Sequence, residues 1–400
     1  MSALVVRLGS VEIGVLERLD DEKQRFTFCE EYTTSLISSR PVLGQIFEDR
    51  FPHALSVDGP ICWFAHLLPQ GVMLRWRSKL LGLDELDSFG LLCQLGNDLP
   101  GAVTLTPGEA ILGPEYPALP GAAPPAEPHS PLFRFSLAGA QWKLSARSSG
   151  RGLTTRALTG GTACIAKFHS PEYPGLPQCE FATMYWAHAA GLRTPEFSLR
   201  SVADFDQIPD EMPTGDGQVF VIERFDRNAE DRIHIEDFGQ ILDRPPGTAQ
   251  YNGSYEEIAS VIRWIAPESA QELLKTIVFH TIAGNGDAHL KNFSVLYPDG
   301  RNAVLTPAYD IVSTMLYFAP GKEELALTLN GQKKFATVNA QSFNRLIEKL
   351  GIEQTAGEVI VQNFTEAAMD AWAQDDIQAK YSAAQVARLK RHLDSMPLTN

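Results

Sequence analysis

The chain has 400 residues and a formal net charge of −15; 44% of its residues are hydrophobic and 21% are charged. This composition excludes an intrinsically disordered protein and allows two or three domains, each with a core of its own. The acidic balance argues against a protein whose main role is to coat nucleic acid, because phosphate binding requires clustered Lys and Arg. The basic cluster at 388–392 is best interpreted as the solvated face of the last helix.

No stretch approaches the roughly 20 apolar residues that span a bilayer, and no lipid-facing amphipathic stretch is found. The N-terminus lacks the basic and apolar regions of a signal peptide. The five cysteines are widely spaced without a CxxC pair, and no histidine has the spacing of a zinc ligand. We therefore expect a cytoplasmic protein with free thiols, no zinc site and no membrane association.

Residues 1–105 are predicted to form a small α/β module. Alternating hydrophobic residues predict short strands at 4–8, 11–16 and 25–29, and a helical stretch begins at Cys62. A helix is expected between a capping Asp87 and a terminal Gly96. Three aromatic residues are expected in the core of the module rather than on a binding surface: Trp63, Phe64 and Trp76.

A linker is predicted at 106–131, because eight prolines between Pro107 and Pro131 forbid helix interiors and sheet centres. The region 132–226 is rich in strand signals, with strands expected at 133–135, 142–146, 162–168 and 219–225 and a helix at 178–191. From 227 to 400 helices are expected to dominate, at 255–265, 269–284, 340–350, 358–373 and 383–396.

Three polar residues of this last region follow the order that a protein kinase uses for its catalytic base and its two magnesium ligands. They are Asp287, Asn292 and, beyond a short hydrophobic segment, Asp310. The chemistry explains the residue types. One carboxylate must face the attacking hydroxyl, while an amide oxygen and a second carboxylate hold the metal that neutralises the triphosphate.

Residues upstream fit a nucleotide site in the matching order. The small residues of 136–143 lie between two strands, where backbone N–H groups can approach phosphates. Lys167 lies in an apolar run, so its charge needs a partner, which phosphate oxygens would supply. Glu180 at the start of the next helix could orient this lysine. The segment 223–225 leaves a buried strand and suits a hinge whose backbone holds an adenine ring.

In these segments the chain resembles the HipA family of bacterial serine/threonine kinase toxins. The resemblance covers nearly the whole chain, and its motifs are Ser136-Leu-Ala-Gly-Ala-Gln, Ala166-Lys-Phe, Glu223-Arg-Phe-Asp-Arg, His234-Ile-Glu-Asp-Phe, Asp287-Ala-His-Leu-Lys-Asn-Phe-Ser, Leu305-Thr-Pro-Ala-Tyr-Asp-Ile-Val-Ser and, in the N-terminal module, Leu67-Leu-Pro-Gln-Gly and Leu95-Gly-Asn-Asp. It implies an α+β, two-lobed protein-kinase-like fold with a small N-terminal α/β module and an all-helical C-terminal lobe. The N-terminal module and the strand-rich region would form one lobe, and the nucleotide would lie between the lobes.

The resemblance also implies a role for each matched residue. Asp287 would be the catalytic base, Asn292 and Asp310 would hold Mg²⁺, and Lys167 would contact the α- and β-phosphates of ATP. The other ATP-binding positions would be Ala138, Gly139, Ala140, Gln141, Trp142 and Lys143 beside the triphosphate, Glu223, Arg224 and Phe225 at the hinge, and His289, Leu290, Lys291 and Tyr309 in the nucleotide pocket. Ser136 matches the family's autophosphorylated serine, whose phosphate expels the loop from the site and switches the kinase off.

Two positions depart from the family pattern. Trp142 replaces an acidic residue, which puts the loop's contact with the γ-phosphate in doubt, and Ala288 replaces a glycine, which is tolerated only if its φ is negative. Two side chains keep alternative interpretations. His289 is either a packing histidine or a nucleotide contact, and Asp237 either caps a helix, which we prefer, or supports the hinge region.

The function expected from this resemblance is phosphorylation of a protein serine or threonine, with growth arrest as the outcome. It implies an aminoacyl-tRNA synthetase, such as glutamyl-tRNA synthetase, as substrate and a HipB-like helix-turn-helix antitoxin as partner. DNA would be contacted only through the antitoxin, whose basic surface the acidic chain would complement. Two other functions stay open: a weakly active co-repressor subunit, against which the intact catalytic groups argue, and a kinase for a small molecule or lipid.

Overall fold

A computed structural model describes residues 2–19, 23–49, 51, 54–108, 141–149, 152–154, 161–228, 231–319 and 324–400. Several sequence-based predictions fall outside these ranges: most of the linker 106–131, the strand at 133–135, and Ser136, Ala138, Gly139 and Ala140. Within the described ranges, no helix combines the length and the apolar character needed to cross a membrane.

The N-terminal module is built on an antiparallel five-stranded sheet in the order β4-β3-β2-β1-β5. The strands are β1 (Ser2–Leu8), β2 (Val11–Arg18), β3 (Lys23–Phe28), β4 (Leu55–Asp58) and β5 (Val103–Pro107). The helices are α1 (Glu30–Thr34), α2 (Gln45–Glu48), α3 (Cys62–Ala65), α4 (Gly71–Leu81) and α5 (Ser88–Leu95). The three predicted strands are confirmed, and the first residues assigned to the linker belong to β5.

Helix α5 shows both ends of the predicted helix. Asp87 caps it, because its Oδ1 accepts a hydrogen bond of 2.9 Å from the backbone N–H of Gly90. Gly96 has a φ of −54°, so left-handed backbone does not explain the glycine. A Cβ atom at this position would lie 2.1 Å from the carbonyl oxygen of Leu105 in β5. The glycine therefore allows the end of α5 to touch the sheet.

Trp63 and Phe64 are fully buried, which confirms their place in the core.

A second sheet of six strands has the order β10-β7-β6-β8-β11-β9. Its strands are β6 (Lys143–Ser149), β7 (Gly152–Thr154), β8 (Thr162–Lys167), β9 (Phe197–Ser201), β10 (Phe205–Asp206) and β11 (Gln218–Glu223). Helix α6 (Leu176–Ala189) packs against β9 and β11, and the chain turns away from it at Gly191, with a φ of +91°. The strands predicted at 142–146, 162–168 and 219–225 and the helix at 178–191 are confirmed.

Helices dominate the C-terminal region, as predicted. They are α7 (Phe238–Ile241), α8 (Tyr255–Ile265), α9 (Ala270–Ile282), α10 (Asn344–Leu350), α11 (Gln354–Trp372), α12 (Asp375–Gln378) and α13 (Ala383–Ser395). The expectation of an all-helical lobe needs a correction, because the region also contains β12 (His234–Asp237), β13 (Ser294–Tyr297) and β14 (Val304–Leu305) in one sheet and the hairpin of β15 (Glu324–Leu329) and β16 (Gln332–Lys334). These strands are short. All four residues of β13 are buried, so its sequence lacks the alternation of apolar and polar residues that predicts a strand.

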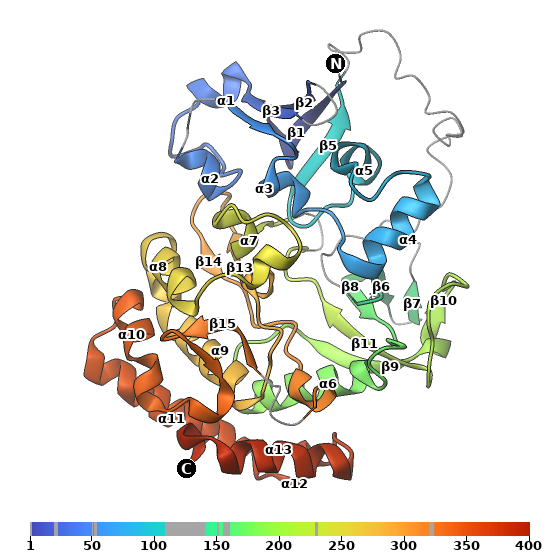
Figure 1. The fold of residues 1–400 in the computed structure, drawn as a ribbon. Helices are drawn as coiled ribbons and strands as arrows, with labels where there is room; N and C mark the ends of the chain where they lie inside the picture. Colours follow the sequence, from blue (N-terminus) through green and yellow to red (C-terminus); the bar gives the residue numbers. More distant parts are fainter. Residues whose placement is uncertain are drawn as a thin grey trace.

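The N-terminal module lies above both other parts of the chain, with α4 approaching the six-stranded sheet and α3 lying close to α7 (Figure 1). A buried glutamate, Glu236 of β12, joins the module to the C-terminal region. Its Oε1 accepts hydrogen bonds from Nε1 of Trp63 at 2.9 Å and from the backbone N–H of Gln45 at 3.0 Å, while its Oε2 accepts one of 2.7 Å from the hydroxyl of Tyr297. Donors from three elements thus converge on one carboxyl group.

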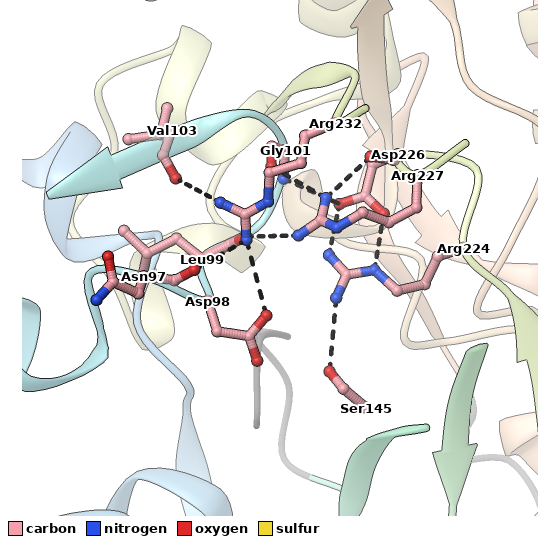
Figure 2. A network of polar contacts seen from close by, with 10 residues as sticks. All are labelled: Asn97, Asp98, Leu99, Gly101, Val103, Ser145, Arg224, Asp226, Arg227 and Arg232. Carbon is pink, nitrogen blue, oxygen red and sulfur yellow. Dashed lines mark hydrogen bonds and ion pairs between the residues drawn. The ribbon is translucent and has the colours of Figure 1, made fainter. Parts of the chain in front are cut away.

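A second polar network joins the module to the segment that follows β11 (Figure 2). The Asp226 carboxylate is buried and accepts two hydrogen bonds from Arg224, at 2.8 and 2.6 Å, and one of 2.7 Å from Arg227. It also accepts the backbone N–H of Gly101 in the module, at 2.9 Å. Arg227 continues to the carbonyl oxygens of Gly101 and Leu99. The carboxylate is therefore the centre of the contact between the module and this segment.

The substitution Asp226→Asn is expected to destabilise the folded chain by about 3–5 kcal/mol, because it leaves the buried Arg224 and Arg227 without their counter-charge and turns an amide N–H₂ toward their donors. The free energy of unfolding, measured in urea, checks this prediction. The matched control is Asp58→Asn, which removes an exposed ion pair with Lys23 and should change stability little. Equal unfolding midpoints for the two variants would show that the network contributes no stability.

A pH-dependent stability is expected from Glu236. Burial outweighs the three donors and raises the pKa of Glu236 to about 7, from 4.5. Between these values the folded chain keeps a proton that the unfolded chain has lost, so stability falls as the pH rises through this window. The Tm difference between the wild type and Glu236→Gln should therefore shrink as the pH rises from about 5 to about 8. A difference that stays constant across this range would contradict the assignment.

Candidate active site

The predicted catalytic loop connects α9 to β13. Hydrogen bonds to α9 and to the segment 310–314 hold it in place. Asn285 is fully buried, accepts the backbone N–H of Asp287 on its Oδ1 at 3.0 Å, and donates from Nδ2 to His280 at 3.0 Å. The same Nδ2 lies 3.5 Å from the carbonyl oxygen of Asp310. The backbone N–H of Gly286 donates to the Thr314 hydroxyl at 2.7 Å. Asn285 therefore ties the backbone of one expected catalytic residue to that of another.

Asp287, the expected base, has a side chain that is 53% exposed. Its backbone carbonyl accepts a hydrogen bond of 2.7 Å from Nδ2 of Asn292, and its Oδ1 accepts one of 2.5 Å from the hydroxyl of Tyr251. Loss of surrounding water raises the pKa of Asp287, and Asp310 adds to this, while His289 and Tyr251 oppose it. A carboxylate with a raised pKa takes up a proton more readily than an ordinary Asp does.

Asn292 and Asp310 leave oxygen atoms available for a metal. The amide nitrogen of Asn292 donates a hydrogen bond to the backbone carbonyl of Asp287. In the described chain no protein group donates to Oδ1 of Asn292. Asp310 has a φ of +56°, a left-handed conformation that Asp tolerates better than most residues, and its Oδ1 contacts Lys167. An amide oxygen and a carboxylate oxygen are the donors that Mg²⁺ prefers, so these two residues fit the ion that the resemblance implies.

Lys167 at the end of β8 is a buried cation of the site. Its Nζ lies 2.5 Å from Oε1 of Glu180 on α6 and 2.5 Å from Oδ1 of Asp310. Burial alone would lower the pKa of this ammonium group, but Asp310 and Glu180 outweigh burial and raise it. Lys167 is therefore charged at neutral pH. Glu180, the carboxylate that the sequence suggested could orient this lysine, contacts it.

The residues 141–143 precede and begin β6, beside β8. Lys143 is paired in register with Lys167, and burial lowers its pKa to about 8, which Asp310 opposes and Lys167 reinforces. Trp142 packs against Trp76 of α4, with ring centroids 6.0 Å apart. The departure at Trp142 therefore has a structural reason, since this ring fills the contact between β6 and the N-terminal module. The amide nitrogen of Gln141 is buried without a partner in the described chain.

The hinge predicted at 223–225 begins at the end of β11. The backbone N–H groups of Glu223 and Arg224 bond to Glu196 and Ala163, and the Arg224 side chain turns to Asp226 (Figure 2). No hydrogen bond to the Phe225 backbone is found within the described ranges, so its N–H and C=O can meet an adenine ring. The Phe225 ring lies 5.3 Å from the ring of Tyr309, whose hydroxyl donates to the Lys291 carbonyl at 2.9 Å.

The side chains of two residues that were expected in the nucleotide pocket make their contacts elsewhere. Leu290 is fully buried in the core of the C-terminal region. Lys291 is buried too, and its Nζ donates to Asp237 at 2.8 Å and to Nδ1 and the carbonyl oxygen of His66 at 3.0 Å. This ammonium group joins the catalytic loop to the N-terminal module. Asp237 is both the preferred cap, since it accepts the Gln240 N–H at 2.9 Å, and a partner of Lys291.

Two expected positions remain: Ala288, which replaces the family's glycine, and His289, which has two interpretations. Ala288 is fully buried and is not among the described non-glycine residues with positive φ, so it meets the condition stated for it. His289 packs edge-on against Tyr251, at 4.7 Å, and its Nδ1 is buried without a partner in the described ranges. Packing and nucleotide contact both remain compatible with this geometry. Tyr251 was missed from sequence, because a tyrosine at the end of a short 3₁₀ helix carries no motif.

The chain is similar in sequence to known proteins along most of its length. Residues 4–106 match the HipA N-terminal domain, and residues 135–372 match the HipA-like C-terminal domain. The chain is 35% identical over 364 residues to Y4dM of Sinorhizobium fredii, which is named as a kinase; the match covers 88% of this chain and 87% of that protein. It is 27% identical over 341 residues to the serine/threonine-protein kinase toxin HipA of Shewanella oneidensis, covering 76% of this chain and 74% of that toxin.

A solved structure shares the fold. HipA of Shewanella oneidensis MR-1, in a complex with HipB and its operator DNA, aligns over 98% of this chain and 97% of its own, with a TM-score of 0.66 and 21% identity. This likeness confirms the predicted α+β, kinase-like architecture. The C-terminal domain match covers more than half of the chain, and the match to Y4dM covers most of it. The chain therefore belongs to the HipA family of serine/threonine kinases.

Proposed function

We propose that the chain transfers the γ-phosphate of ATP to a serine or threonine hydroxyl of a protein. The observation that supports this most directly is the ion pair of Lys167 with both Glu180 and Asp310, beside the loop that carries Asp287. In protein kinases a lysine held by a helix glutamate positions the phosphates, and the metal-binding Asp lies next to it. Here Lys167 would contact the α- and β-phosphates, and the Phe225 backbone would hold the adenine ring.

In the transfer step, the acceptor oxygen bonds to the γ-phosphorus, the bond from that phosphorus to the ADP oxygen breaks, and the acceptor proton passes to Asp287. The raised pKa of Asp287 favours this uptake. Asn292 and Asp310 would hold Mg²⁺, which neutralises charge on the phosphates when it is bound. Lys143, the second buried lysine, would add positive charge beside the triphosphate.

Partners and regulation follow from the family. We propose a HipB-like helix-turn-helix antitoxin as partner, because HipA of Shewanella oneidensis was solved with HipB and operator DNA. DNA would be reached only through that partner, since the net charge of this chain is −15. An aminoacyl-tRNA synthetase is the proposed substrate, with growth arrest as the result. Ser136, outside the described residues, is the proposed site of autophosphorylation that switches the kinase off.

The substitution Asp287→Asn should lower the rate of phosphate transfer by about 10²–10⁴-fold, because the amide cannot take the acceptor proton. The measurement is incorporation of label from γ-labelled ATP into proteins of a cell lysate and into the chain itself. Asp299→Asn is the matched control, since Asp299 lies in the turn after β13, where it accepts backbone N–H groups of its own loop.

Wild type and Asp299→Asn should transfer label at similar rates. Phosphopeptide mapping of wild-type and Asp287→Asn samples would then identify the acceptor protein and show whether Ser136 is modified. Transfer by Asp287→Asn at the wild-type rate would refute Asp287 as the base. A wild-type chain that transfers no label at all would refute the proposed function and leave the co-repressor role.

A further inference from the structure

The catalytic loop has a contact that the kinase pattern does not assign. The hydroxyl of Tyr251 donates a hydrogen bond of 2.5 Å to Oδ1 of Asp287. Tyr251 ends a short 3₁₀ helix at 248–251, before α8, and is far from Asp287 in sequence. Its ring packs edge-on against His289, with centroids 4.7 Å apart and an interplanar angle of 84°. Two residues of the catalytic loop thus contact the same tyrosine.

The β15–β16 hairpin holds the segment that carries Tyr251. Nζ of Lys333 donates to the carbonyl oxygen of Ala326 at 2.7 Å and lies 3.5 Å from that of Tyr251. The Gly253 carbonyl accepts both the backbone N–H of Thr328, at 3.1 Å, and its hydroxyl, at 3.3 Å. The tyrosine is therefore part of a fixed support rather than of a freely moving loop.

The hairpin itself is built to be rigid. Its turn residues Asn330 and Gly331 have φ values of +48° and +77°, and Asn-Gly is the pair favoured in two-residue hairpin turns with positive φ at both positions. The backbone N–H of Asn330 donates to Oε1 of Glu256 in α8, at 2.6 Å. Two anchors, one on the Tyr251 segment and one on α8, thus hold the hairpin.

The polar groups of Asp287, except Oδ2, form hydrogen bonds within the protein. Its N–H is bonded to Asn285, its carbonyl oxygen to Asn292 and its Oδ1 to Tyr251, whereas Oδ2 has no hydrogen-bond partner in the described ranges. We propose that Tyr251 is a positioning residue of the kinase, whose hydroxyl holds Oδ1 of Asp287 so that Oδ2 faces the acceptor hydroxyl. This inference rests on the proposed function of Asp287 as the base.

Three ionisable groups besides Tyr251 interact with the Asp287 carboxylate: His289, Lys143 and Asp310. Burial and Asp287 raise the pKa of Tyr251 itself, so it remains a donor at neutral pH.

The test uses Tyr251→Phe in the full-length chain, which keeps the ring against His289 and removes only the hydroxyl. Initial rates of label transfer from γ-labelled ATP into lysate proteins are measured against ATP concentration, after subtraction of the label incorporated by lysate alone. We expect kcat to fall by roughly 10- to 100-fold, as for loss of a hydrogen bond to a charged group. KM for ATP should stay the same.

Tyr185→Phe is the matched control, because the Tyr185 hydroxyl donates to Asp376 at 3.2 Å on an exposed surface away from the site. It should behave as wild type. Combining Tyr251→Phe with Asp287→Asn should cause no further loss beyond Asp287→Asn, since the hydroxyl acts through that carboxylate. Thermal unfolding of each variant shows whether a lost rate reflects lost structure.

Each result has one meaning. A Tyr251→Phe variant that retains wild-type kcat overturns the positioning role while leaving Asp287 as the base. A variant with higher kcat/KM also overturns it, and shows that the hydroxyl competes with the acceptor for Asp287. A rate that falls by the same factor in the Asp287→Asn background assigns Tyr251 a purely structural role. A wild-type chain without transfer activity contradicts the proposed function itself.

Discussion

The site depends on a buried cluster of opposite charges. Lys167 touches Glu180 and Asp310, and Lys143 lies beside them on the neighbouring strand. Each of these ions would be costly to bury alone, and their mutual attraction offsets the loss of water only because the geometry is close. The cluster also joins three parts of the chain: β6 and β8, helix α6, and the loop after β14. Formation of the candidate site and contact between the six-stranded sheet and the C-terminal region are thus coupled.

The N-terminal module supports this arrangement at two functional points. Through Asp226 it holds the segment that directly follows the predicted hinge (Figure 2). Through His66 it contacts Lys291, the residue before Asn292. Both contacts are buried and polar, so they specify position more strictly than apolar packing does. A change in the module can therefore reach the predicted hinge and the predicted catalytic loop separately, along two short paths that do not share a residue.

The sequence indicated the residues of the candidate site better than the contacts that hold them. The spacing of Asp287, Asn292 and Asp310 needs only local geometry, and α8 begins and ends where its hydrophobic period indicates, at 255–265. The burial of Lys291 against His66 and the contact of Tyr251 with Asp287 could not be predicted, because each joins residues far apart in the chain and neither has a motif. Strand β13 was missed because a run of four buried residues fits helix and strand equally.

The two halves of the candidate site differ in exposure, and under the proposed function this difference would separate catalysis from substrate choice. Lys167 and Glu180 are buried and already paired, so folding would preorganise the half that is proposed to bind phosphate. The Asp287 side chain is 53% exposed, which would leave the proposed base open to a hydroxyl on another protein. The buried half would then fix the nucleotide, and the choice of acceptor would depend on the surface around Asp287.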